Sequence, residues 1–358
     1  MDLDLEDRMR VSALPWRGQF SPMTVERLLQ TFAPEGATVI DPFVGSGTAL
    51  LEASRRGHAS IGLDVNPAAV ALAQCAALAG LPARERRDRL DAACATLERE
   101  GVELPRQSGT VQLAHALALL SQGKTVDVAR RKIEALIAGL PAEPVETNVL
   151  LRDARATGLP SRCAGFALTS PPYINVFNYH QVGRPLSDAF GWPVLGAARS
   201  EIGSNRQNRS NRFRTVVQYS LDMALVVVEL SRVLEVGATA VLVLGRESRV
   251  RGVPFFNGEI VGRLVEAIGV FGQLSKGQRC FVSRFGESIT EDVLVLKENG
   301  AADPPNDEEL ANLARAVGRQ ALEEAPATDQ TEGELAAAID SAAQISSSTM
   351  AIPKLDFR

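Results

Sequence analysis

Short apolar runs alternate with helical stripes along most of the chain. The runs at residues 37–40, 59–63, 165–169 and 239–245 are rich in aliphatic residues, and between them lie stretches with apolar residues one helical turn apart. Continuous apolar runs predict buried parallel strands, and their alternation with helices predicts an α/β fold. We therefore expect a doubly wound, Rossmann-like sheet.

An insertion interrupts this alternation after the second strand. Residues 80–146 carry three apolar stripes at helical spacing, separated by Gly or Pro, which predict a helical subdomain. Four arginines of this segment are interspersed with acids, and this favours a solvated helix face over a DNA contact. They are Arg84, Arg86, Arg87 and Arg89.

The remaining boundaries follow from composition. Residues 1–14 lack periodicity and are expected to form a loose arm, and residues 15–79 and 147–299 are expected to form the two halves of one α/β domain. Residues 300–358 are acidic and rich in Ala, Glu, Ser and Pro, so we expect a disordered tail with one weak helix near residues 309–324.

The second half of the domain has a recognisable layout. Apolar periodicity predicts helices at residues 219–234 and 258–271. Two strand-like runs at residues 278–285 and 292–296 flank a glycine, which predicts a hairpin.

The first strand leads into the sequence Asp41-Pro42-Phe43-Val44-Gly45-Ser46-Gly47-Thr48. Its two glycines remove side chains where a ligand could approach the backbone, and the N–H groups of the next helix suit a negative group. A phosphate-binding P-loop would carry a lysine where Thr48 stands. Asp64 ends the second strand, where nucleoside-binding folds place an acid on the ribose hydroxyls. A purely structural tight turn is the alternative.

A rarer motif, Thr169-Ser170-Pro171-Pro172-Tyr173, ends the third strand-like approach. Together with the glycine turn it resembles the amino-methylating DNA methyltransferases, which act on cytosine N4 or adenine N6. The resemblance covers roughly residues 15–297 and implies a class I methyltransferase fold with S-adenosylmethionine as cofactor. Many relatives with a Ser-Pro-Pro-Tyr motif place it before the glycine turn, whereas here the order is reversed.

The resemblance also implies a set of cofactor-binding residues. The Phe20-Ser21 segment resembles a family motif whose backbone holds the methionine end of the cofactor, although Ser21-Pro22 equally fits the start of a helix. Asp153 resembles the acid that binds the adenine amino group, with an ordinary loop aspartate as the alternative. The expected set is Phe20, Ser21, Asp41, Pro42, Phe43, Gly45, Gly47, Thr48, Asp64 and Asp153.

The predicted catalytic residues are Ser170, Pro171, Pro172 and Tyr173. An exocyclic amine is a poor nucleophile because its lone pair is delocalised into the ring, and hydrogen-bond acceptors for both N–H groups aim that lone pair at the methyl donor. Ser170 Oγ and the Pro171 carbonyl are the expected acceptors. Tyr173 is expected to stack on a base extruded from the duplex, with a core tyrosine as the alternative.

The residue before the two prolines distinguishes the target amines within the family. Serine is usual there in cytosine-N4 enzymes and aspartate in adenine-N6 enzymes, so Ser170 predicts N4-methylcytosine. Methylation at cytosine C5 is disfavoured, because none of the four cysteines follows a proline. The alternatives are an adenine-N6 DNA methyltransferase, an RNA base methyltransferase, and a non-catalytic DNA-binding subunit that kept the fold.

The net charge of -5 is unevenly distributed. Residues 298–358 hold 12 acids and 4 bases, which leaves a net charge of +3 on residues 1–297 and suits a nucleic-acid partner. In the segment 175–214, arginines interleave with Asn and Gln, a composition typical of phosphate and base contacts. We expect double-stranded DNA as the partner, with a mobile polar loop as the alternative. The expected contacts are Arg199, Arg206, Arg209, Arg212 and Arg214.

Several other classes of protein are disfavoured. The cysteines lack metal-site spacing, so no metal is expected. No apolar run is long enough to span a bilayer and the N-terminus is acidic, which predicts a cytoplasmic protein without membrane contact. The motifs fit a bacterial restriction-modification or defence system. They leave open an oligomer or a partner subunit, because no separate recognition domain is apparent.

Overall fold

A computed structural model describes residues 14–16, 20–101, 111–175, 178–192, 194–282, 286, 288–300 and 303–350. These residues form two compact units. The first unit comprises residues 14–153 and 179–198, and the second unit comprises residues 154–178 and 199–350, each with the gaps just given. Apart from Leu14, the predicted N-terminal arm lies outside the described residues.

The central element is a seven-stranded sheet with the strand order β3-β2-β1-β4-β5-β9-β8. The pairs β1–β2, β2–β3 and β4–β5 are parallel, whereas β9 pairs antiparallel with both β5 and β8. The predicted α/β fold with a mostly parallel sheet is therefore confirmed. The strands are β1 (Val39–Asp41), β2 (Ser60–Asp64), β3 (Thr147–Leu151), β4 (Ala164–Thr169), β5 (Leu234–Gly245), β8 (Phe271–Val282) and β9 (Ser288–Glu298).

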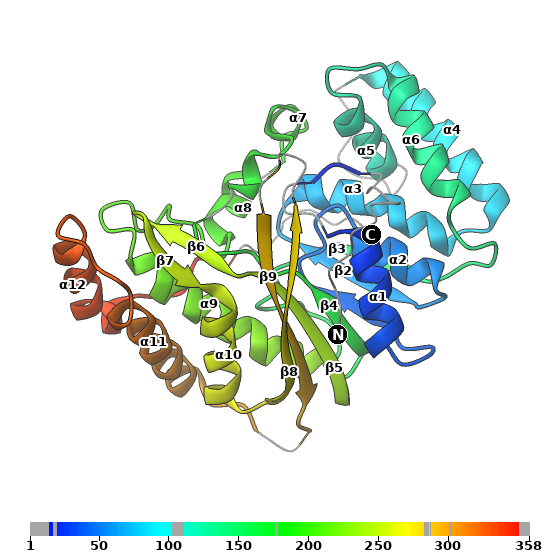
Figure 1. Cartoon of the computed structure of the whole chain (residues 1–358). Helices are drawn as coiled ribbons and strands as arrows, with labels where there is room; N and C mark the ends of the chain where they lie inside the picture. The colour runs from blue at the N-terminus through cyan, green and yellow to red at the C-terminus, as the bar shows by residue number, and fades with distance from the viewer. Residues whose placement is uncertain are drawn as a thin grey trace. The chain divides into compact units, whose positions relative to one another are not determined.

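Helices of the first unit accompany its three parallel strands (Figure 1). Every residue of α3 is buried except Gln74 and Ala77, because the helix packs against α2, α5 and the strands β2 and β3. Asn66 starts this helix by accepting a hydrogen bond from the Ala68 N–H. The elements are α1 (Pro22–Phe32), α2 (Thr48–Arg55), α3 (Pro67–Ala77), η1 (Leu78–Gly80), η2 (Tyr179–Gln181) and α7 (Arg184–Ala189).

The predicted insertion contains the helices α4 (Ala83–Glu100), α5 (Val111–Ser121) and α6 (Val126–Ala138). They lie side by side in Figure 1, and α5 also packs on α3. The aromatic cluster of His115, Phe190 and Trp192 joins α5 to the segment after α7, with ring centroids 4.6 to 5.0 Å apart. The insertion therefore packs on the rest of the first unit through α3 and through the segment after α7.

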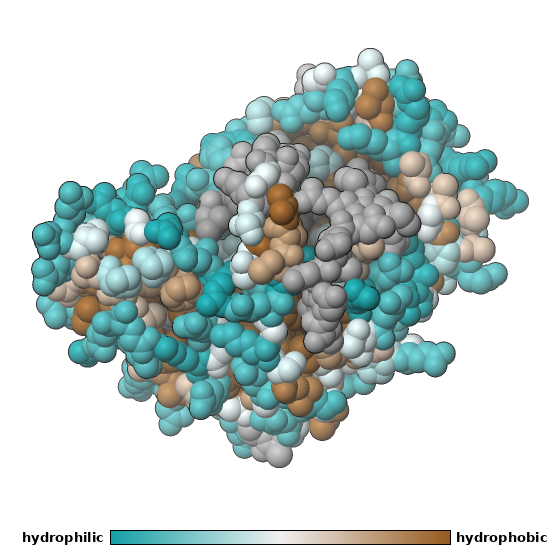
Figure 2. Space-filling view, viewed as in Figure 1, coloured by the Kyte–Doolittle hydropathy of each residue, from teal (hydrophilic) through white to brown (hydrophobic). Residues whose placement is uncertain are grey.

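The arginines of α4 do not all lie on a solvated face, contrary to the sequence-based prediction. Arg84, Arg87 and Arg89 are exposed, and hydrophilic residues line the outer edge of this region in Figure 2. Arg86 is buried instead and donates hydrogen bonds to the carbonyls of Leu81, Pro141 and Ala79. The guanidinium, which has several donors, thus joins three backbone carbonyls around the start of α4, and its role is structural.

The second unit combines its strands with two long helices. Helix α9 is buried along most of its length and contacts β5, α10 and α11. A small two-stranded sheet, β6–β7, precedes α10. The elements are α9 (Arg214–Val233), β6 (Glu247–Val250), β7 (Val253–Phe256) and α10 (Asn257–Ile268), and the helix α8 (Val194–Ser200) leads into this unit.

Residues 303–350 of the C-terminal segment are folded and largely helical, which corrects the prediction of a disordered tail for this part of the chain. Helix α11 (Asp307–Glu323) starts with a capping box between Asn306 and Glu309 and packs against α9 and α10, and α12 (Glu332–Asp340) and η3 (Ala342–Gln344) follow it (Figure 1). A Cβ on Gly318 would lie 2.7 Å from the Cα of Val217, so the two backbones approach closely. Four apolar residues at helical spacing, hidden in an acidic sequence, explain the packing: Leu310, Ala314, Val317 and Leu322.

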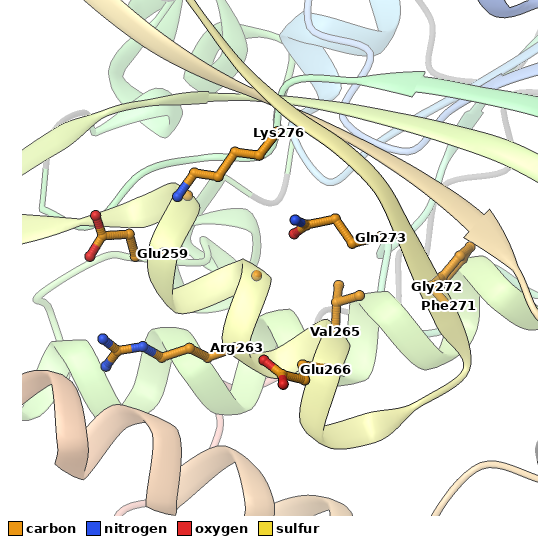
Figure 3. Close-up of a pocket in the computed structure, with 10 residues that line it drawn as sticks. Glu259, Arg263, Val265, Glu266, Phe271, Gly272, Gln273 and Lys276 are labelled. Atoms are coloured by element: carbon orange, nitrogen blue, oxygen red, sulfur yellow. The ribbon is translucent and has the colours of Figure 1, made fainter.

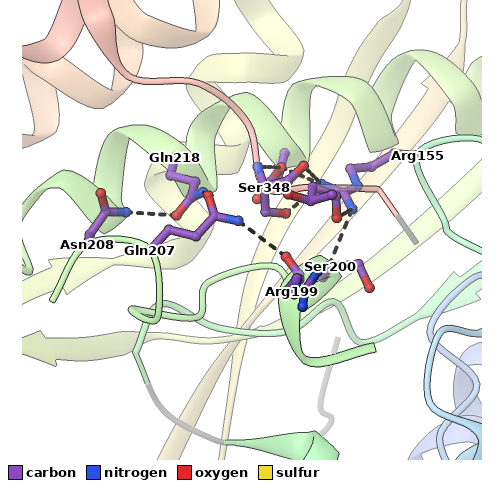
Figure 4. A network of polar contacts seen from close by, with 9 residues as sticks. Arg155, Arg199, Ser200, Gln207, Asn208, Gln218 and Ser348 are labelled. Atoms are coloured by element: carbon purple, nitrogen blue, oxygen red, sulfur yellow. Dashed lines mark hydrogen bonds and ion pairs between the residues drawn. The ribbon is translucent and has the colours of Figure 1, made fainter. Parts of the chain in front are cut away.

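A buried ion pair fixes the last described residues to α9 (Figure 4). Arg155 Nη1 lies 2.7 Å from Asp222 Oδ1, and both side chains have 0% exposure. Arg155 also donates to the carbonyl and hydroxyl of Ser348, and the Ser348 N–H donates to Asp222. The second guanidinium nitrogen reaches the carbonyl of Ser200. Residues distant in sequence therefore share one buried charge centre, which we call the Arg155 clamp.

Candidate functional site

The glycine turn of the first unit begins where β1 ends. Asp41 accepts a hydrogen bond from the Phe43 N–H at 3.1 Å, and the Gly47 N–H donates to the Val44 carbonyl at 2.8 Å. Gly45 and Gly47 adopt positive φ angles of 51° and 86°, a region that disfavours side chains. Gly47 then caps the start of α2, which begins with Thr48. The predicted strand, turn and helix are all present.

The two glycines serve packing within the unit as well as the turn. A Cβ on Gly45 would lie 2.9 Å from Cδ1 and Nε1 of Trp16, and a Cβ on Gly47 would lie 3.0 Å from the Cα of Ala73 in α3. The sequence predicts that a ligand approaches the backbone where these side chains are missing. The protein itself fills the position of each missing side chain, which the sequence does not reveal.

Asp64 ties the second strand to the glycine turn. One carboxylate oxygen accepts from the Gly45 N–H at 3.1 Å and the other from the Asn66 N–H at 2.8 Å. Burial raises the pKa of Asp64 to about 6, although these backbone donors oppose the shift. The carboxyl is therefore ionised at neutral pH and sits at the carboxyl end of β2, where it can accept further hydrogen bonds.

The strand register brings the third predicted acid to the same edge of the first unit. Asp64 is paired with Leu151 across β2 and β3, and Asp153 follows two residues later with its side chain buried. Ser21 and Pro22 begin α1, but the Ser21 hydroxyl makes no capping hydrogen bond. Phe20, Asp41, Pro42 and Thr48 are buried, and Phe43 is half-buried in the turn. The first unit thus contains the glycine turn and the two strand-end acids.

The Ser-Pro-Pro-Tyr turn lies in the second unit, directly after β4. Ser170 Oγ and Tyr173 Oη are 3.3 Å apart, within hydrogen-bond distance. The Tyr173 ring packs on the end of β5, because a Cβ on Gly245 would lie 2.6 Å from its Cε2 atom. Burial raises the pKa of Tyr173, so the phenol stays neutral and keeps its proton. The turn therefore presents a hydroxyl pair held against the sheet.

Asn257 supports this turn and was missed by the sequence analysis. It is fully buried at the start of α10, accepts a hydrogen bond from the Ile174 N–H at 3.2 Å, and donates to the Gly245 carbonyl at 2.7 Å. One side chain thus links the residue after Tyr173 to the strand on which Tyr173 packs. A polar residue at the predicted start of a helix was the only visible signal.

The arginine segment, residues 199–214, begins beside the same turn. The Asn175 N–H donates to the Gly203 carbonyl, and a Cβ on Gly203 would lie 2.3 Å from the Tyr173 carbonyl oxygen. Gly203 also has a positive φ of 77°. Only glycine fits this position without strain, so the backbones of the turn and the arginine segment are in direct contact.

Amide side chains of the arginine segment are hydrogen-bonded through Gln218 of α9. Asn208 donates to Gln218, Gln218 donates to Gln207, and Gln207 donates to the Arg199 carbonyl (Figure 4). We call this series of hydrogen bonds the amide ladder. Asn211 similarly donates to the Glu334 carbonyl of α12. The arginines are presented by this ordered framework: Arg199, Arg209 and Arg212 are exposed, and Arg206 and Arg214 are partly buried.

A separate pocket of about 600 Å³ lies between α10 and β8 of the second unit (Figure 3). Helix α10 contributes Glu259, Arg263 and Glu266, and β8 contributes Gln273 and Lys276. None of the predicted site residues lines it. Among the residues described, no cluster of His, Cys, Asp or Glu could hold a metal ion. Within the same residues, no helix is long and apolar enough to cross a membrane.

Comparison with known proteins matches part of the chain. Residues 10–75 match the N6_N4_Mtase family, described as DNA methylase. A segment of 53 residues is 43% identical to the Type II methyltransferase M.MjaII of Methanocaldococcus jannaschii, covering 15% of this chain and 10% of that protein. A segment of 47 residues is 36% identical to the Type II methyltransferase M.ScaI of Streptomyces caespitosus, covering 13% of this chain and 16% of that protein. The chain thus matches only a small part of each relative.

Solved structures resemble the chain more distantly. A SAM-dependent methyltransferase from Methanosarcina mazei is 13% identical with a TM-score of 0.41, over 76% of this chain and 97% of that chain. The rRNA methyltransferase AviRa of Streptomyces viridochromogenes is 16% identical with a TM-score of 0.37, over 87% of this chain and 94% of that chain.

The family match covers the glycine turn and Asp64 but ends before Ser170. This part of the chain is therefore similar to DNA methylases.

Proposed function

We propose that this chain is an S-adenosylmethionine-dependent DNA methyltransferase that methylates the N4 amine of cytosine. The observation that carries the proposal is the turn after β4, where Ser170 lies within hydrogen-bond distance of a neutral Tyr173. A strand-end hydroxyl beside two prolines is suited to accept a hydrogen bond from an amine. The two curated relatives are Type II methyltransferases, which favours a role in a restriction-modification system.

The residues of the first unit fit the cofactor. S-adenosylmethionine has ribose hydroxyls that donate hydrogen bonds, and the ionised Asp64 carboxylate provides acceptors at the end of β2. Asp153, one strand further along the edge, is the proposed partner of the adenine amino group.

The proposed chemistry assigns separate roles to the turn residues. The bound cofactor supplies an electrophilic methyl group on a sulfonium. Ser170 Oγ and the Pro171 carbonyl would accept hydrogen bonds from the two amine hydrogens and orient the nitrogen lone pair for in-line attack. The N–C bond would form as the S–C bond breaks, the neutral thioether S-adenosylhomocysteine would leave, and the amine would release one proton to solvent. Tyr173, anchored on Gly245, holds the Ser170 hydroxyl and stacks on the extruded base.

The neutral hydroxyl favours cytosine over adenine. Aspartate at this position would accept through a longer, charged group, whereas serine is short and suits the smaller ring. The family correlation between serine and cytosine-N4 methylation points the same way. An adenine-N6 enzyme is the alternative.

Product analysis tests the proposal directly. The protein is incubated with S-adenosylmethionine and unmethylated genomic DNA, and the digested nucleosides are separated by mass spectrometry. We expect N4-methylcytosine. N6-methyladenine as the only product would refute the cytosine assignment, and cofactor binding without any methylated nucleoside would favour a non-catalytic DNA-binding subunit.

The exposed arginines are proposed to contact DNA phosphates. Each phosphate contact releases counterions, so Arg209→Ala and Arg212→Ala should each flatten the plot of log binding constant against log salt by about one unit. Fluorescence anisotropy with duplex DNA at several salt concentrations measures this slope. Arg319→Ala, at an exposed pair on α11, is the matched control and should leave the slope unchanged. Unchanged slopes in both test variants would place the DNA contact elsewhere.

Cofactor affinity should depend on pH through Asp64. Ribose hydroxyls donate better to a carboxylate than to a carboxylic acid, so affinity should fall as the pH drops below about 6, by up to about tenfold per unit. For folding the sign is opposite: the folded pKa exceeds 3.8, so ionising this carboxyl weakens folding as the pH rises from about 4 to about 6. Calorimetry between pH 5 and 7 measures the affinity, and Asp64→Asn should bind more weakly and lose the pH dependence. A parent-like pH profile in Asp64→Asn would exclude the ribose role.

A further inference from the structure

Trp16 lies against the glycine turn of the first unit. Its Cδ1 and Nε1 atoms occupy the space beside Gly45, since a Cβ on that glycine would approach both within 2.9 Å. Gly45 is also the residue whose N–H binds Asp64. The indole therefore borders the residue that joins the two cofactor-binding strand ends.

The sequence around Trp16 anchors it without burying it. Leu14 is fully buried and Phe20 is 8% exposed, whereas Trp16 between them is only half-buried. An aromatic ring that packs against a glycine turn and stays partly open to solvent is suited to contact a ligand there.

The ligand proposed for this turn carries a permanent positive charge. Aromatic rings attract cations, and tryptophan does so most strongly among the side chains. The sulfonium of S-adenosylmethionine is cationic, whereas the thioether of the product, S-adenosylhomocysteine, is neutral. A tryptophan at the methionine end would therefore bind the methyl donor more tightly than the spent cofactor.

We propose that Trp16 forms a wall of the cofactor site and that its indole favours the charged sulfonium over the neutral product. The proposal rests on the proposed function only in taking S-adenosylmethionine as the cofactor. It assigns to Trp16 a part in cofactor selectivity, separate from the target base and from DNA.

Tryptophan fluorescence tests the contact. The chain has two tryptophans, and Trp192 is buried in the cluster with His115 and Phe190. We expect S-adenosylhomocysteine to change the emission of the parent protein and of Trp192→Phe, but not that of Trp16→Phe. Comparing the parent with Trp16→Phe gives the answer even if Trp192→Phe folds poorly. Calorimetric binding to the parent without a change in emission would overturn the contact.

Binding selectivity tests the role of the charge. Calorimetry gives the affinities of the parent, Trp16→Phe and Trp16→Leu for S-adenosylmethionine and for S-adenosylhomocysteine, without DNA and without turnover. In Trp16→Leu we expect the preference for the charged cofactor to fall by about threefold to fivefold, with partial retention in Trp16→Phe. An unchanged preference in Trp16→Leu would overturn the proposal. A parent protein that binds neither compound would instead refute the proposed function, before any variant is compared.

Discussion

Replacing Ser170 with alanine is expected to lower kcat by roughly 10² to 10³, because a hydrogen bond aimed at the reacting group contributes most in the transition state. Ser170 Oγ is held by Tyr173 at 3.3 Å, so its position is set before substrate arrives. Cofactor affinity and DNA affinity should change little, since neither depends on this hydroxyl. Initial rates of methyl transfer from labelled cofactor, with both affinities measured separately, check the prediction.

Tyr173→Phe is the matched variant. It keeps the ring that packs on Gly245 and removes only the hydroxyl that contacts Ser170. We expect a smaller loss of about fivefold, in line with one neutral hydrogen bond of about 1 kcal/mol. Parent-like turnover in Ser170→Ala would exclude the proposed mechanism, whatever the outcome for Tyr173→Phe.

Replacing Arg155 with leucine is expected to lower the free energy of unfolding by about 3 to 5 kcal/mol, because it leaves the Asp222 carboxylate buried without its cation. Both side chains of the pair are inaccessible to solvent, so water cannot replace Arg155 as the hydrogen-bond donor to the carboxylate. Urea unfolding followed by circular dichroism measures the change. Arg319→Leu, which breaks an exposed pair with Glu323, should cost less than about 1 kcal/mol.

Truncating the chain after Gln344 tests the contribution of the C-terminal segment while the Arg155–Asp222 ion pair is kept. This truncation removes Ser348, whose N–H donates to Asp222 and whose carbonyl and hydroxyl accept from Arg155. We expect a clear loss of stability by the same urea measurement. Unchanged stability in both the truncation and Arg155→Leu would show that the Arg155 clamp contributes nothing to the fold.

Local patterns predicted the strands and the glycine turn because their signals lie within short stretches. The apolar run before Asp41 and the run before Asp64 correspond to β1 and β2, and the glycines fall in a turn with positive φ. The three stripes of the insertion likewise correspond to α4, α5 and α6. In each case local burial and periodicity determine the element.

Contacts between distant residues could not be predicted in this way. The C-terminal segment was expected to be disordered because its acids outweigh its apolar residues in composition, yet α11 buries one apolar stripe against α9. Trp16 against Gly45 and Tyr173 against Gly245 are pairs whose partners lie far apart in the chain. Neither spacing nor propensity specifies such a pair, because it depends on how the strands are ordered in the sheet.

The amide ladder affects the expected thermodynamics of the proposed DNA contact. Its hydrogen bonds fix the rotamers of Gln207, Asn208 and Gln218 in the folded protein. Ordering a flexible polar side chain at an interface costs about 0.5 to 1.5 kcal/mol, mostly as entropy. Here that entropy is lost when the chain folds and not when DNA binds. The backbone that carries the arginines would then already be ordered before a duplex binds. Variants that break the ladder would then bind with a larger entropic penalty even where every arginine remains.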